Sequence, residues 1–123
     1  MIRLALIVGL GGFLGSSARF LVQQLFLRVL PGVNVAGTFV ANILGCFIIG
    51  ICIEQSGRMQ REWLVFLTSG FCGGFTTFSA FALENTNFMI GGNSGHAALY
   101  IGLSIVLGLL ATYAGMLIAK TII

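Results

Sequence analysis

Long apolar runs alternate with short polar segments along the whole chain. The runs cover residues 4–27, 35–53, 64–90 and 97–119. Each approaches or exceeds the roughly 20 residues that an α-helix needs to cross the hydrocarbon core of a bilayer. Because the runs are long and lack strict apolar–polar alternation, β-barrel strands do not fit them. The pattern predicts an all-α membrane protein, with residues 1–123 forming a single domain of four transmembrane helices.

The third run contains a cluster of residues that weaken a helix. Gly73 and Gly74 are followed by Thr76 and Thr77. Glycine and β-branched residues lower helix propensity, and unwound backbone at bilayer depth needs protein or a water-filled cavity around it. Broken helices bring carbonyl and amide groups to a central ion or substrate site. We expect a break at residues 73–77; a continuous helix with small residues for close packing is the alternative.

Composition excludes several classes of protein. Hydrophobic residues make up 58% of the chain and charged residues 7%, whereas a soluble domain carries about 25% charged residues. The net charge of +3 comes from scattered basic residues that flank apolar runs, so we expect no nucleic-acid partner. The chain has no Ser-His-Asp set, metal-ligand cluster or phosphate-binding loop. We therefore expect that it is not an enzyme and has no organic cofactor.

Basic residues are unevenly divided between the two ends of the predicted bundle. Four crossings put both termini on one side, together with Arg3, Arg58, Arg61 and Lys120, and leave Arg28 on the other. The positive-inside rule then favours cytoplasmic termini. The bias is small, and insertion in both orientations remains open.

Polar residues recur inside the runs at helical spacing. Thr38 and Asn42 are one turn apart in the second run, and Tyr100 and Ser104 are one turn apart in the fourth. Residues at this spacing share a helix face. They either line a polar pathway or form hydrogen bonds between helices. A single four-helix bundle leaves little room for a pathway, so we expect a homodimer.

Four more residues in the runs carry candidate chemistry. Arg19 either attracts anions to a vestibule or extends its side chain to the headgroups. Phe78 and Phe81 are three residues apart; they either pack among apolar groups, as phenylalanine usually does in a membrane, or turn ring edges, which carry partial positive charge, toward a small anion. Glu84, one turn beyond Phe81, is a proton site, a hydrogen-bond acceptor or an interfacial residue.

Three segments together resemble one known family. The stretch GFCGGFTTFSAF, residues 70–81, resembles the third-helix signature of the Fluc (CrcB) fluoride channels. GGFLGSSARF, residues 11–20, and GTFVANILGCFIIG, residues 37–50, resemble the first-helix and second-helix motifs of that family. The resemblance covers essentially the whole chain. Ala80 departs from it, because the family usually has a threonine there, and the missing hydroxyl interrupts the polar track.

The resemblance implies an antiparallel, dual-topology homodimer, or a heterodimer with a paralogous chain, in the bacterial plasma membrane. Each dimer would hold two pores that export cytoplasmic fluoride passively, and a structural Na⁺ at its centre. The backbone carbonyls of Gly73 and Thr76 match the family's sodium ligands. The pore positions of the family fall on Asn42, Phe78, Phe81, Ser79, Ser104, Tyr100 and Thr38. Arg19 matches the vestibule arginine, and Glu84 also matches a family position.

Fluoride is small and strongly hydrated, so a pore must replace its water with hydrogen-bond donors. Weak binding at several sites permits conduction, whereas a fixed positive charge in the pore would hold the ion too tightly. Two alternatives remain open. A proton-coupled small multidrug-type exporter would use Glu84 as its membrane carboxylate, and a non-transporting membrane assembly subunit would have packed helices and no pathway.

Overall fold

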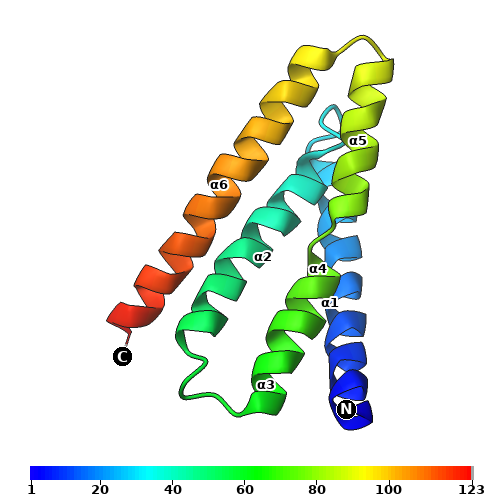
Figure 1. Ribbon diagram of the computed structural model, residues 1–123. Coiled ribbons are helices and arrows are strands. Elements are labelled where there is room, and N and C mark those ends of the chain that lie inside the picture. Colours follow the sequence, from blue (N-terminus) through cyan, green and yellow to red (C-terminus); the bar gives the residue numbers. More distant parts are fainter. Residues whose placement is uncertain (123) are drawn as a thin grey trace.

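The computed structural model describes residues 1–122 and contains only helices and their connections over this range. Four helical stretches are long and apolar enough to cross a membrane: Ile2–Val29 (α1), Ala36–Glu54 (α2), Arg61–Ile90, and Ser94–Thr121 (α6). The predicted all-α fold with four membrane-spanning stretches is confirmed. Both termini lie at the same end of the molecule, beside the connection from α2 to the third stretch (Figure 1).

The third stretch is not one helix. It consists of α3 (Arg61–Val65), the π-helical turn η1 (Phe66–Cys72), α4 (Gly73–Phe75) and α5 (Phe78–Ile90). Thr76 (φ −86°, ψ 155°) and Thr77 (φ −148°, ψ 114°) have extended backbone between α4 and α5. The predicted break is therefore confirmed at these two threonines, and the continuous-helix alternative is wrong. Figure 1 shows α5 as a separate helix beyond this narrow connection.

Glycines bring α1 into backbone contact with the first half of the third stretch. A Cβ atom at Gly11 would overlap the carbonyl oxygen of Phe66, and one at Gly15 would overlap that of Phe71. From the opposite side, a Cβ at Gly74 would lie 3.0 Å from the Ser16 nitrogen. These positions accept no side chain without movement of backbone. The small-residue spacing in α1 thus sets how closely α4 approaches it.

A second pair of helices, α2 and α6, is joined in the same way. A Cβ at Gly50 would overlap the Thr112 carbonyl oxygen, and one at Gly115 would overlap that of Phe47. Gly37, at the start of α2, packs on the Cα of Gln23 in α1. The fold therefore has two glycine-joined pairs, with α2 linking one pair to the other.

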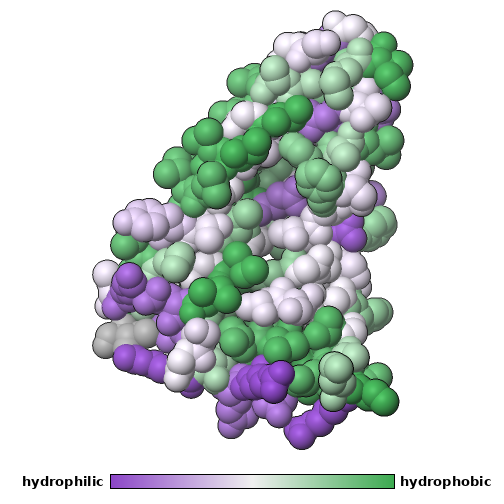
Figure 2. Space-filling model, viewed as in Figure 1, coloured by the Kyte–Doolittle hydropathy of each residue, from purple (hydrophilic) through white to green (hydrophobic). Residues whose placement is uncertain are grey.

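Most large apolar side chains are exposed in the single chain. Phe13 is 68% exposed, Leu109 is 69% exposed and Phe78 is 80% exposed. Hydrophilic residues gather at the end that holds the termini and the α2–α3 connection, while hydrophobic residues cover much of the surface above it (Figure 2). A surface of this kind suits lipid or a partner subunit.

Candidate functional site

The side-chain amide of Asn42 forms two hydrogen bonds with the backbone of Thr77, at the break in the third stretch. Its Nδ2 donates to the Thr77 carbonyl oxygen at 3.2 Å, and its Oδ1 accepts from the Thr77 N–H at 2.7 Å. The N–H needs an acceptor and the carbonyl needs a donor, so the amide can lie only one way round. One hydrogen of Nδ2 then remains without an acceptor in residues 1–122. An uncharged donor is thereby held beside the break.

The same rearrangement releases two backbone carbonyls. In a continuous helix, the N–H groups of Thr77 and Ala80 would donate to the carbonyls of Gly73 and Thr76. Here the Thr77 N–H donates to Asn42, and the Ala80 N–H donates to the Thr77 hydroxyl at 3.2 Å. The two carbonyls predicted as sodium ligands are therefore among those whose helical donors have been diverted. Oxygen ligands of this kind fit a hard cation.

Four of the predicted pore residues face a single cavity of about 430 Å³, which we call the break cavity. Asn42, Phe78, Phe81 and Ser104 line it, with Thr76 and Gly73 at the break. Within the described residues, the lining contains no charged side chain. The Ser104 hydroxyl forms no hydrogen bond within residues 1–122, so it is a second available donor. The cavity offers uncharged donors next to aromatic rings.

The two phenylalanines are adjacent but differ in exposure. The Phe78 and Phe81 ring centroids are 5.9 Å apart and the planes are tilted by 41°. Phe78 is 80% exposed, whereas Phe81 is half-buried and presents its ring to Tyr100 edge-on, at 5.1 Å between centroids. Phe78 therefore extends beyond the surface of its own chain, while Phe81 belongs to the interior.

A second polar cluster surrounds the carboxylate of Glu84. The Thr38 hydroxyl donates to Oε1 of Glu84 at 2.6 Å, and the Tyr100 hydroxyl donates to Oε2 at 2.7 Å. Gln23 in turn donates its Nε2 to the Thr38 hydroxyl at 3.2 Å. Thr38 is 1% exposed and Tyr100 is 6% exposed. Helices α1, α2, α5 and α6 each contribute one residue to this network.

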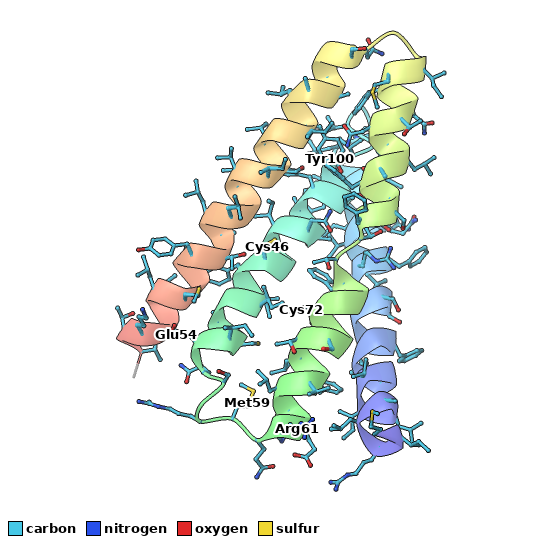
Figure 3. The ribbon with its side chains drawn as sticks, in the orientation of Figure 1. Cys46, Glu54, Met59, Arg61, Cys72 and Tyr100 are labelled. Atoms are coloured by element: carbon cyan, nitrogen blue, oxygen red, sulfur yellow. The ribbon has the colours of Figure 1, made fainter. Side chains whose placement is uncertain are left out.

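Glu84 and Tyr100 line a second cavity of about 730 Å³, the carboxylate cavity. It extends to His96 and Asn93 at the start of α6. Figure 3 shows Tyr100 between α5 and α6 in the upper half of the molecule. Tyr100 lines this cavity and Phe81 lines the break cavity, so the edge-on contact of their rings joins a lining residue of each.

The structure places the other predicted site residues outside both cavities. Ser79 is exposed, and its hydroxyl lies 3.3 Å from that of Thr77. Arg19 is half-buried in α1 and donates its Nε to the carbonyl oxygen of Gly74 at 3.0 Å. Both residues therefore contact the break from its rim.

Two residues of these clusters were not among the predicted sites. Thr77 caps α5 through its side chain and is the partner of Asn42; a threonine three residues before the N–H that it caps is a known helix-start signal. Gln23 lies on the same helix face as Arg19. Its hydrogen bond to Thr38 joins two different helices, so residue spacing along one helix cannot predict it. Cys46 and Cys72 also line the break cavity, on α2 and η1 (Figure 3).

Comparison with known proteins shows the family of the chain. Residues 6–116 match the family described as CrcB-like protein, Camphor Resistance (CrcB). The chain belongs to the CrcB family. A relative from Azobacteroides pseudotrichonymphae genomovar. CFP2, named fluoride-specific ion channel FluC, is 39% identical, with 98% of each chain covered. The resemblance drawn from residues 70–81 is thus confirmed.

Two further relatives carry the same name. The protein from Chlorobium phaeobacteroides strain DSM 266 is 42% identical over 94% of this chain and 91% of its own length. The protein from Flavobacterium psychrophilum is 40% identical over 92% of this chain and 94% of its own. These CrcB relatives are named as ion channels, so the prediction that the chain is not an enzyme is confirmed. The chain is a multi-pass membrane protein.

Proposed function

We propose that this chain forms a fluoride-selective channel. The observation that carries the proposal is the free N–H of Asn42 in the break cavity. The two hydrogen bonds between Asn42 and Thr77, which we call the bracket, hold this N–H in place. Phe78, Phe81 and Ser104 line the cavity around it, and among the described residues the lining contains no charged side chain. Uncharged donors and ring edges replace water around a small anion and still release it. The names of the CrcB relatives agree with this ion.

The conducting unit is an antiparallel homodimer, or a heterodimer with a related chain, with two pores. Phe78 supports this part of the proposal because it lines the break cavity and is yet 80% exposed. A pore ring of this exposure would face lipid in a single chain. A second subunit covers it and closes the cavity on its open side.

A structural sodium ion lies at the centre of the dimer. The carbonyls of Gly73 and Thr76 support it, since their helical donors are diverted and Gly73 is exposed at the surface of the chain. Each subunit would supply these two oxygens to the shared ion. The cation would hold together two helix breaks whose carbonyl dipoles otherwise repel each other.

Fluoride leaves the cell passively through these pores in the plasma membrane. A membrane potential that is negative inside drives an anion outward with about 2.3 kcal/mol per 100 mV. No energy source is therefore required. Arg19 near the break would raise the local concentration of anions at the pore entrance.

Ion flux from liposomes tests the proposal. Purified protein in liposomes loaded with potassium fluoride should release fluoride when valinomycin is added, and release chloride only at the background rate. Phe78→Ile and Phe81→Ile should reduce fluoride flux strongly, while Phe13→Ile, which changes an exposed phenylalanine outside both cavities, should not. Absence of fluoride flux from folded wild-type protein would support the assembly subunit instead. Undiminished flux in both pore variants would contradict the assigned pathway.

A further inference from the structure

Arg19 is a cation inside a membrane-spanning helix without a carboxylate partner. The one ion pair within residues 1–122 joins Arg3 to Glu62, at the end of the bundle. Arg19 instead donates Nε to the carbonyl oxygen of Gly74 at 3.0 Å. Gly74 lies in the last turn before the break. A charged side chain is costly inside a membrane. The charged group of Arg19 forms its hydrogen bond with a single backbone oxygen, that of Gly74.

The local sequence explains how Arg19 reaches that oxygen. Side chains on an α-helix point back toward its N-terminus, so Arg19 covers the turn that contains Gly15. Gly15 has no side chain to obstruct it, and Gly74 packs directly on the α1 backbone at Gly12 and Ser16. The close approach of α1 and α4 therefore creates the path along which the guanidinium meets the break.

The bond replaces one that the break has removed. In a continuous helix the Gly74 carbonyl would accept the N–H of Phe78, but Phe78 begins α5 beyond the extended residues. A charge-assisted hydrogen bond is stronger than a neutral one, and a cation near a helix C-terminus also complements the helix dipole. Arg19 thereby fixes the orientation of the last peptide groups of α4.

We propose that Arg19 is a positioning residue for the sodium site of the proposed channel. By holding Gly74, it keeps the neighbouring carbonyls of Gly73 and Thr76 directed outward as a pair. Its own positive charge would repel the cation rather than bind it. The benefit to sodium binding therefore comes from the hydrogen bond and not from the charge. This inference rests on the proposed function and adds a second role to the vestibule role.

Two substitutions separate the hydrogen bond from the charge. Glutamine at position 19 retains an N–H donor without a charge. Lysine retains the charge but has no donor at the position of Nε. A positioning role predicts that Arg19→Gln preserves sodium binding better than Arg19→Lys. A role confined to attracting anions predicts the opposite order for fluoride flux and no change in sodium binding.

Thermal unfolding of the purified protein in detergent provides a readout that does not depend on conduction. The unfolding midpoint is measured against Na⁺ concentration, with N-methylglucamine as the replacement cation. Arg19→Ala should raise the half-saturating Na⁺ concentration by about tenfold or more, as expected for loss of a hydrogen bond to a charged group. Arg19→Gln should recover most of this loss and Arg19→Lys less. Arg28→Gln, which removes a charge from the last turn of α1, should match wild type.

The outcomes that overturn the inference are specific. Unchanged or tighter sodium binding in Arg19→Ala contradicts it, and so does recovery by lysine but not by glutamine. If Arg19→Ala does not fold, the comparison of glutamine with lysine still decides. Wild-type protein that conducts fluoride without stabilisation by sodium would refute this inference and leave the channel in place. Wild-type protein that is stabilised by sodium without conducting fluoride would refute the channel alone.

Discussion

The break cavity and the carboxylate cavity treat polar groups at membrane depth in opposite ways. In the break cavity, Asn42 satisfies the backbone of Thr77 and still has a donor hydrogen to spare. At the carboxylate cavity, Tyr100 and the buried Thr38 beside it each donate a hydroxyl hydrogen to Glu84, so both donors are already bonded. Within the described residues, the break cavity therefore has an N–H without an acceptor, whereas the hydroxyl donors at the carboxylate cavity are all bonded to Glu84.

This difference bears on the proposed selectivity for a small anion. A small anion needs donors that have no stronger partner, and the break cavity provides them. The carboxylate cavity contains an acceptor that would repel the same ion, and the Thr38 and Tyr100 hydroxyls are already bonded to that acceptor. The edge-on contact of Phe81 with Tyr100 lies between these two environments.

The largest effect should come from the glycine packing between α1 and η1. Gly15→Ala places a Cβ on the Phe71 carbonyl oxygen, so α1 and η1 must separate. Overpacking of this kind costs about 1–3 kcal/mol or more. We expect a large fall in thermal stability, measured by unfolding in detergent. Gly9→Ala, with no atom within 4 Å of the new Cβ, should behave like wild type; equal stability of the two variants would contradict the packing argument.

The second largest effect should come from a change in the two hydrogen bonds between Asn42 and Thr77. Asn42→Asp replaces the Nδ2 donor with an oxygen that faces the Thr77 carbonyl, and it puts a negative charge in the break cavity. Fluoride flux in liposomes should fall by about 100-fold or more. The reason is that the variant loses the uncharged Nδ2 donor and gains a negative charge that repels fluoride. Gln60→Glu, the same chemical change in an exposed connection, should leave flux unaltered. Flux within a fewfold of wild type for Asn42→Asp would show that this amide is not in the pathway.

A smaller effect is expected in the carboxylate cavity. Tyr100→Phe keeps the ring against Phe81 and removes the hydrogen bond to Glu84. Loss of one donor to a partly buried carboxylate should cost roughly 1–3 kcal/mol of stability and should lower fluoride flux by about tenfold. Tyr113→Phe, on the same helix and 61% exposed, is the matched control. Identical unfolding midpoints for the two variants would exclude a structural role for the Tyr100 hydroxyl.

The smallest effect on flux should follow Glu84→Gln, and this variant separates the channel from the proton-coupled exporter. The glutamine oxygen still accepts from Thr38, and the Tyr100 hydroxyl can accept from the new amide. Fluoride flux should change by less than about tenfold and show no dependence on a proton gradient. Proton-driven cation transport that disappears in Glu84→Gln would favour the exporter.

Much of this fold could be predicted from the residues alone. The apolar runs indicate the four spans, and the predicted break at residues 73–77 contains the two residues that are extended. Thr38 and Asn42, one turn apart on α2, both form hydrogen bonds to the third stretch. Local propensity and periodicity are enough for features of this kind.

The partition of the site could not be predicted in the same way. Tyr100 and Ser104 are one turn apart on α6, yet they line different cavities. The bond from Arg19 to Gly74 and the bracket between Asn42 and Thr77 join helices that are distant in sequence. Such partners depend on how closely the helices approach, and that distance is set by glycine contacts between backbones rather than by spacing along one helix.

The bracket on Thr77 also has an entropic consequence. A glutamine or asparagine side chain that is free to rotate loses conformational freedom when it binds an ion. The amide of Asn42 has already lost that freedom during folding, because two bonds to one residue fix both its tilt and its position. The direction of its remaining hydrogen is thus set by the main chain of another helix, so an arriving ion meets a preorganised donor.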